Sequence, residues 1–190
     1  MKRRRVIAAV VVLLTITAGA AWLVGRSGYV VRVDGGPLAC PDCGAQASSI
    51  PVPLNVPVSY GLIYLRNRGS RTAVIERVRV LNARPGIEVV GTSVVRPTGR
   101  VGLLVGYPPE DPRSPLKPVE GFRVLPSGEE NRVYQLVLGV RLTRYGRSSF
   151  RHVEIDYRVG RARYRAVFRD SLALCASLRE RYPDCDTPPL

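Results

Sequence analysis

Four cysteines are the residues of this chain whose type and spacing most directly suggest chemistry: Cys40, Cys43, Cys175 and Cys185. An even number of cysteines in a domain outside the cytoplasm favours disulfide bonds, although spacing alone does not fix which cysteines pair. Local pairing, which closes one small loop near each end of the domain, is the interpretation that we favour. Crossed pairing stays open, because longer loops gain more from closure, on the order of 4 kcal/mol.

The sequence of the first pair, Cys40-Pro41-Asp42-Cys43-Gly44, allows two sharper interpretations. A thioredoxin-like redox pair requires a strand before the motif and a long helix after it, whereas Pro51 interrupts the chain soon after this motif. A zinc site requires a second close pair, and Cys175 and Cys185 are too widely spaced for one. A thiol–disulfide or metal-binding role of the Cys40–Cys43 pair stays open as the alternative function.

Titratable residues elsewhere do not form a catalytic constellation. His152 is the only histidine, and it is predicted to share the outward face of a strand with Glu154 and Asp156 in a solvated ladder of charges. A Ser-His-Asp hydrolase instead needs a base buried beside its nucleophile. We therefore predict no catalytic residue, no metal ion and no cofactor, in a chain that is not an enzyme.

A group of arginines offers a different kind of site, a contact with anions. Five of them lie on or near one predicted hairpin: Arg158, Arg161, Arg163, Arg165 and Arg169. The guanidinium group binds phosphate in a bidentate geometry, so anionic lipid headgroups or a cell-wall polymer are candidate ligands. The alternative is a face that is simply solvated. Nucleic acid is not expected, because the strands lack outward aromatic residues on which bases could stack.

The net charge favours the same class of partner without identifying one. The chain carries +14 at pH 7, and residues 2–5 supply four of these charges. The remainder, about +10, would attract anionic surfaces. Lys2 and Lys117 are the only lysines, and this excess of arginine also fits the codon usage of a GC-rich genome.

The N-terminus predicts a membrane anchor. Residues 1–5 are basic after Met1, and residues 6–24 contain no charge and no proline, which is close to the ~20 residues that span a bilayer as a helix. The basic flank is expected to stay in the cytoplasm, so the rest of this single-pass protein would lie outside the cell membrane. The alternative is a secretory signal cleaved after Ala20, because Ala18-Gly19-Ala20 fits a cleavage site.

From residue 56 onward, hydrophobic and polar residues alternate, which predicts β-strands. We expect strands over residues 56–65, 72–81, 87–95, 101–107, 133–143, 153–159 and 163–168, with a short one near residues 30–33. In the first of these, the alternating residues Val56, Val58, Tyr60, Leu62 and Tyr64 should face the core. In the second, Ala73–Ile75 should hold a bulge. The pattern favours an antiparallel β-sandwich over a parallel α/β sheet. One short helix is expected near residues 172–181.

Residues 108–120 interrupt the strands with a proline-rich loop. Five prolines remove hydrogen-bond donors from this segment, so it should have polyproline character rather than form a strand: Pro108, Pro109, Pro112, Pro115 and Pro118. Loops of this length are usually functional or loosely ordered. The loop is therefore a candidate site for a protein partner.

Two turn segments resemble a known family. Leu65 to Ala73 (LRNRGSRTA) leads into a strand, and Leu125 to Glu129 (LPSGE) precedes a long alternating strand. This pattern resembles bacterial immunoglobulin-like modules of the CARDB type, over roughly residues 56–143. The resemblance implies an adhesive or spacing module, and the whole chain is similar to membrane-anchored proteins of GC-rich Gram-positive, actinobacterial-type bacteria.

Together these features predict a mainly β chain with five segments. They are a cytoplasmic basic flank (1–5), a transmembrane helix as signal anchor (6–24), a juxtamembrane segment with a cysteine pair (25–50), an immunoglobulin-like sandwich (51–170) and a tail with the other two cysteines (171–190). The expected function is that of a membrane-anchored, extracytoplasmic binding or scaffolding module.

Overall fold

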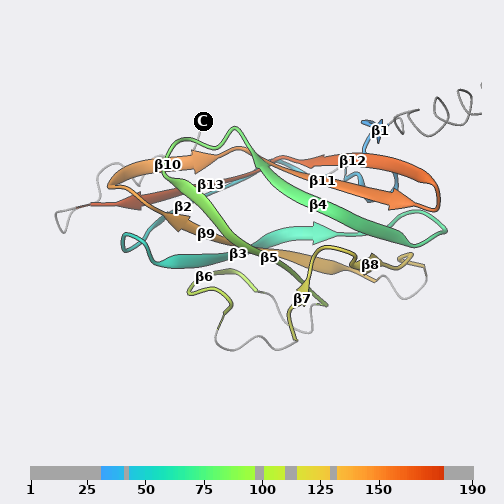
Figure 1. Cartoon of the computed structure of the whole chain (residues 1–190), viewed down its shortest axis with the longest axis horizontal. Helices are drawn as coiled ribbons and strands as arrows, with labels where there is room; N and C mark the ends of the chain where they lie inside the picture. The colour runs from blue at the N-terminus through green and yellow to red at the C-terminus, as the bar shows by residue number, and fades with distance from the viewer. Residues whose placement is uncertain (1–30, 41–42, 97–100, 110–114, 129–131, 178–190) are drawn as a thin grey trace, which may run out of the picture. The chain divides into compact units, whose positions relative to one another are not determined.

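A computed structural model describes residues 31–40, 43–96, 101–109, 115–128 and 132–177, and in these ranges the chain is mainly β (Figure 1). Thirteen strands and one short 3-10 helix, η1 (Gly36–Leu38), make up this part of the protein. None of the helices in these ranges is long and apolar enough to cross a membrane. The predicted basic flank, anchor helix and cleavage site at Ala20 all lie outside the described residues.

The strands form three sheets. The first is β1 (Val31–Arg32), β12 (Ala162–Phe168), β11 (His152–Val159), β4 (Ala73–Leu81) and β8 (Arg123–Val124), in that spatial order. The second is β10 (Gly146–Phe150), β13 (Asp170–Ala176) and β2 (Gln46–Pro51). The third is β6 (Leu103–Val105), β3 (Pro57–Leu65), β9 (Tyr134–Leu142), β5 (Ile87–Val95) and β7 (Lys117–Pro118). Strands also lie in the flanking segments 25–50 and 171–190, because β1, β2 and β13 pair into the first two sheets.

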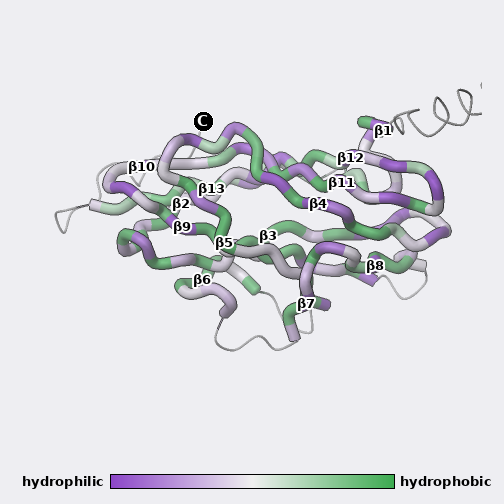
Figure 2. Tube along the Cα trace, in the orientation of Figure 1, coloured by the Kyte–Doolittle hydropathy of each residue, from purple (hydrophilic) through white to green (hydrophobic). Residues whose placement is uncertain are grey.

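The main core collects the inward side chains of all three sheets. Its fully buried members include Tyr60, Phe150, Leu136, Ile155 and Leu172. The alternation predicted for β9 and β11 is confirmed, and hydrophobic and hydrophilic residues alternate along β11 and β4 (Figure 2). Because alternate side chains of a strand point to opposite faces, this pattern directs the hydrophobic face of each strand into the main core.

The inward face of β3 changes at a bulge that the sequence pattern did not predict. Val58 and Tyr60 are buried as expected, but the register of β3 on β9 then shifts between Tyr60 and Ile63. Ile63 and Leu65 therefore enter the core instead of Leu62 and Tyr64, so that part of the prediction is wrong. One extra residue in a strand moves all later side chains to the other face. In β4, the register shifts at Glu76, one residue beyond the predicted bulge.

The outer face of the third sheet is covered by the segment after β5. Val101, Tyr107 and Leu116 pack on Val95 and Val137 and form a second, smaller core. β9 is therefore buried on both faces, which the alternation alone did not indicate. Within the proline-rich stretch 108–120, β7 pairs with β5, so part of the predicted loop is an edge strand. Its Pro118 is tolerated there because an edge strand leaves one side without hydrogen-bond partners.

Tyr107 fastens this covering segment to the sheet. Its ring lies over a cross-strand pair of glycines, and an added Cβ would lie 2.3 Å from the ring at Gly91 and 2.4 Å from it at Gly139. The Tyr107 hydroxyl also shares a hydrogen bond of 2.7 Å with Ser93 Oγ. The two glycines thus leave the space that the Tyr107 ring occupies, and a side chain at either position would collide with the ring.

The helix predicted near residues 172–181 is wrong for the part that the structure describes. Leu172–Ala176 belong to β13, which pairs with β10 on one side and β2 on the other. The segment is rich in Leu and Ala, which favour helices. Hydrogen bonding on both edges and burial of Leu172 and Leu174 override that preference.

Candidate functional site

The first cysteine pair forms a local disulfide. Cys40 and Cys43 are bonded, with 5.2 Å between their Cα atoms, and the favoured local pairing is confirmed for them. Cys175 is also disulfide-bonded, whereas Cys185 lies outside the described residues. Cys40 is partly buried and Cys43 is exposed, so the two residues differ in their access to solvent.

Tyr157 holds the segment that leads into this disulfide. Its hydroxyl donates a hydrogen bond of 2.6 Å to the Gly35 carbonyl and accepts one of 3.1 Å from the Leu38 amide. Leu38 is buried beneath this contact, and the Tyr157 ring stacks on Tyr164. Burial is the main cause that raises the pKa of Tyr157, and the hydrogen bond from Leu38 opposes it. The position of Cys40 is therefore fixed by side chains of the first sheet.

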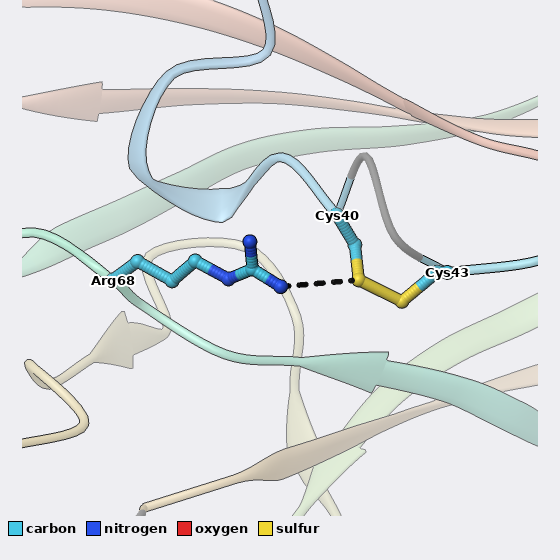
Figure 3. The surroundings of a disulfide bond; sticks show 3 residues. All are labelled: Cys40, Cys43 and Arg68. Atoms are coloured by element: carbon cyan, nitrogen blue, oxygen red, sulfur yellow. Dashed lines mark hydrogen bonds between the residues drawn. A yellow bond between two sulfur atoms is a disulfide. The ribbon is translucent and has the colours of Figure 1, made fainter.

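Arg68 lies beside the disulfide, in the turn between β3 and β4 (Figure 3). Its Nη2 is 3.7 Å from Cys40 Sγ, and its backbone amide donates a hydrogen bond of 2.9 Å to the Pro37 carbonyl. The turn itself is held by the buried Asn67, whose amide donates to the Arg71 and Val124 carbonyls and accepts from the Gly69 amide. Arg68 is therefore placed next to Cys40 by a backbone contact and a buried amide.

A pocket opens beside the Cys40–Cys43 disulfide. It has a volume of about 410 Å³, and Cys40 and Cys43 both line it. Val33 and Val167 form an apolar part of the lining and are 76% and 50% exposed. Asp34, Arg169 and Phe168 are among the other lining residues. The disulfide is thus accessible from a hollow that has both apolar and charged walls, which we call the disulfide pocket.

The predicted arginine face carries a network of ion pairs within the first sheet. Arg165 Nε lies 2.8 Å from Asp156 and 3.4 Å from Glu154, and Arg79 contacts the same two carboxylates. The hydrogen bond with Asp156 is the main cause that raises the pKa of Arg165. Glu154 is buried under these arginines, so the prediction of a solvated carboxylate at this position is wrong.

Glu76 neutralises part of the remaining arginine face. Its carboxylate lies 3.3 Å from Arg163 Nε and 3.7 Å from Arg158 Nε. Arg161 and Arg169 are exposed and have no ion pair within the described ranges. Since three of the five predicted arginines already face carboxylates of their own sheet, this surface is much less positive than the sequence suggests.

A second pocket combines positive charge with an apolar floor. Its volume is about 630 Å³, and it lies among β5, β7, β8 and β9. We call it the cationic pocket; its lining residues include Arg96, Lys117, Arg123, Phe122 and Tyr134. The three basic residues are exposed, and among the residues that the structure describes none of them has an ion pair and no carboxylate lines the pocket. The rings of Phe122 and Tyr134 pack edge to face, with 5.3 Å between their centroids.

Asp170 and Tyr60 form a buried pair where β12 passes into β13. Asp170 is 8% exposed, and burial raises its pKa to about 6, while a hydrogen bond from Tyr60 opposes this shift. Burial, followed by the charge of Asp170, raises the pKa of Tyr60. The Tyr60 hydroxyl has no hydrogen-bond partner with good geometry in the described part of the chain, so its contact with Asp170 is a loose one. The carboxyl group therefore takes up a proton at a higher pH than an exposed aspartate does.

His152 and the acidic residues do not assemble a catalytic or metal site in the described ranges. His152 Nδ1 lies 3.4 Å from the Asn82 amide, on the outside of the first sheet. No group of three or more His, Cys, Asp or Glu side chains in these ranges is placed to hold a metal ion. The disulfide also removes the thiolates that a zinc ion would need from Cys40 and Cys43.

Two features of these sites were missed by reasoning from the sequence. Arg68 looked like an ordinary turn residue, since its contact with Cys40 joins positions 28 residues apart. Arg96, Lys117 and Arg123 are scattered along the chain and become neighbours only through the pairing of β7 with β5 and of β8 with β4. The proline-rich loop was the one signal that pointed to the second region.

No protein-family model matches the sequence, and no curated protein is similar to it at a significant level. Function must therefore be argued from the residues and geometry of the chain itself.

Proposed function

We propose that this protein is a membrane-anchored, extracytoplasmic binding module, and that the cationic pocket receives an acidic, apolar peptide segment of a partner protein. The observation that carries this proposal is the chemistry of the pocket lining. Arg96, Lys117 and Arg123 line the pocket together with the aromatic residues Phe122 and Tyr134, and no carboxylate is among the lining residues that the structure describes. Ligand sites commonly combine an apolar floor with a few polar groups in a cavity of this size, about 300–1,000 Å³.

Charge distinguishes this pocket from the arginine face. On the first sheet, Arg158, Arg163 and Arg165 are compensated by carboxylates. At the cationic pocket, a ligand would supply the missing negative charge, and complementary charges raise both specificity and association rate. Its apolar side chains would cover Phe122 and Tyr134, so the preferred ligand carries acidic and apolar groups side by side.

The location in the proline-rich region supports a peptide as the ligand. Pro115 and Lys117 belong to this region and line the pocket, and β7 is the edge of the third sheet. Extended peptides commonly bind beside an exposed strand edge, with alternate side chains directed into pockets. A free anion could satisfy the charge of the pocket but would leave its apolar floor uncovered.

Peptide binding can be measured with the full chain in phosphatidylcholine nanodiscs. The probe is a fluorescent heptapeptide of alternating glutamate and leucine, and anisotropy reports its affinity against empty nanodiscs. We expect saturable binding that weakens by at least about tenfold in the double variant K117E/R123E. Heptapeptides that alternate glutamine with leucine, or glutamate with serine, should bind much more weakly than the probe.

The matched control reverses two exposed arginines outside the pocket, R66E/R161E, and should leave the affinity unchanged. Equal affinity of the pocket variant and the wild type would overturn the proposal. Binding of phosphatidylglycerol vesicles through Lys117 and Arg123, without binding of the peptide, would identify a lipid headgroup as the ligand and would also overturn it.

The proposal includes an immunoglobulin-like sandwich as the scaffold. Mostly antiparallel strands, and sheets that share one core, support this finer fold assignment. The two segments on which the CARDB-type resemblance rests also meet, because Asn67 bridges to Pro126 and its carbonyl accepts a hydrogen bond from the Ser127 amide. Both contacts support a scaffold of this type.

The proposal also places residues 6–24 in the membrane and the strands outside the cytoplasm. The uncharged segment and its basic flank support this location. Alkaline extraction should leave the protein in the membrane fraction, and protease added to spheroplasts should degrade the β domain. Release by alkaline carbonate, or protection from added protease, would contradict this location.

A further inference from the structure

We infer that the Cys40–Cys43 disulfide is an exchange site that oxidises thiol pairs of extended polypeptides, with Arg68 stabilising the sulfur that leaves. Cys40 and Cys43 both line the disulfide pocket, so an incoming thiolate can approach their disulfide without unfolding of the sheets. The inference is independent of the cationic pocket, because the two sites share none of the lining residues that the structure describes.

The exchange step has a defined direction. A substrate thiolate attacks Cys43 Sγ, forms a mixed disulfide with it, and displaces Cys40 as a thiolate. A second thiolate of the same substrate then attacks its own sulfur in the mixed disulfide and displaces Cys43. The substrate leaves as a disulfide, two electrons remain on the Cys40 and Cys43 sulfurs, and the two substrate thiol protons pass to solvent and to the protein thiols.

Access and charge select Cys43 as the sulfur under attack. Cys43 is exposed, whereas Cys40 is partly buried against the main core. Arg68 Nη2 lies 3.7 Å from Cys40 Sγ, where it would favour the thiolate form. Exchange is faster when the leaving thiol has the lower pKa, so the pathway that releases Cys40 is preferred.

Arg68 is held in place before any substrate arrives. Its backbone amide is bound to Pro37, in the segment that carries Cys40, and Asn67 fixes the turn from the other side. These contacts fix the backbone from which the exposed Arg68 side chain reaches Cys40, so less freedom is lost when the guanidinium pairs with the thiolate. In contrast to a thioredoxin-type pair, the charge comes from an arginine rather than from the start of a long helix.

The pocket walls indicate which substrates can approach. Val33 and Val167 are among the large hydrophobic residues that remain exposed, and both line the disulfide pocket. They would contact apolar side chains of an extended or unfolded polypeptide, while Asp34 and Arg169 lie in the same walls. A small thiol can undergo the same chemistry but would leave these valines uncovered.

The first test uses the full chain and glutathione as the thiol probe. After acid quenching, peptide fragmentation in the mass spectrometer locates the mixed disulfide. We expect glutathione on Cys43, with reduction of this disulfide well before that of Cys175 under native conditions. Reduction of both disulfides only in denaturant would overturn the inference, and so would trapping of glutathione mainly on Cys40.

The second test isolates the effect of Arg68 on the leaving thiol. In C43S, the pH dependence of alkylation reports the pKa of Cys40, and the added change R68Q should raise this pKa by roughly half a unit to one unit. In the otherwise unchanged chain, R68Q should slow reduction by glutathione about three- to tenfold.

The matched control is R66Q, which neutralises an exposed arginine two residues away and should change neither the alkylation profile nor the reduction rate. Circular dichroism of each variant checks that the β-sheets are intact. An alkylation profile and a reduction rate that are both insensitive to R68Q would overturn the role of Arg68. If C43S does not fold, the rate in the chain with both cysteines decides the question alone.

Discussion

Asp170 is expected to make the stability of this fold depend on pH, and the substitution D170N measures the effect. The carboxyl group is 8% exposed, and burial raises its pKa from 3.8 to about 6. In the unfolded chain it regains its ordinary pKa. The folded state therefore binds a proton more tightly than the unfolded state between these two values.

The sign of the effect follows from this difference in proton binding. Below pH 4 the group is protonated in both states and costs nothing, whereas above pH 6 folding must bury a charged carboxylate. The free energy of unfolding should therefore fall as pH rises from about 4 to about 6 and stay lower above that range. A pKa difference of this size corresponds to at most about 3 kcal/mol, since one pKa unit equals about 1.4 kcal/mol.

Urea denaturation of wild type and D170N between pH 4 and pH 7.5 isolates this contribution, because all other groups are common to both proteins. The free energy of unfolding of D170N relative to wild type should increase over this range, by up to about 3 kcal/mol. E88Q, which removes an exposed carboxylate paired with Arg141, provides the control and should change stability by less than about 1 kcal/mol.

Tyr60 offers a second check on the same reasoning. Its hydroxyl lowers the pKa of Asp170, so Y60F should raise that pKa further and extend the pH-dependent loss of stability to higher pH. A stability difference between D170N and wild type that does not change between pH 4 and pH 7.5 would refute the idea that burial controls this carboxyl group.

Three further predictions concern the contacts that hold the covering segment and the turn near Cys40. G139A places a Cβ 2.4 Å from the Tyr107 ring, and it should lower the free energy of unfolding in urea by about 1–3 kcal/mol and speed amide exchange in β6. The control G102A should be neutral, because a Cβ added at Gly102 meets no described atom within 4 Å. Q135L removes the amide that binds the Gly61 carbonyl and both backbone groups of Val101, and should lower the melting temperature through a loss of about 2–4 kcal/mol; wild-type stability would contradict this role. N67A should cost about 2–3 kcal/mol in urea denaturation, whereas S70A in the same turn should cost almost nothing, and equal effects would show that the Asn67 amide is not what holds the turn.

Much of the fold could be predicted from the period-two pattern, because burial on one face leaves a clear trace in sequence. β5 has the predicted bounds, and the inward faces of β9 and β11 are as expected. The pattern failed where a second layer adds burial. Gln135, Val137 and Gly139 of β9 would be outward in a two-layer structure, and only the chain segment around Tyr107 explains why they are buried.

The failures at β3 and β13 have a different physical cause. A bulge leaves little trace in sequence, and the one after Tyr60 depends on backbone contacts of Gly61 with residues far along the chain. For β13, local preference favours a helix, while the decisive interactions are hydrogen bonds to β2 and β10, which are distant in sequence. Local patterns cannot report such non-local pairings.

Charged sites were harder to predict than strands, because the effective charge of an arginine depends on strand register. Glu154 lies opposite Arg79, and Asp156 opposite Arg165, so the pairing of β11 with its two neighbours places carboxylates against arginines. The bulge at Glu76 contributes a third carboxylate to that face. The most arginine-rich hairpin thereby loses much of its positive character, while the scattered Arg96, Lys117 and Arg123 keep theirs because no carboxylate of the described ranges lines their pocket. A search for anion-binding surfaces in such a sheet must therefore count unpaired cations after register is known, rather than arginines along the chain.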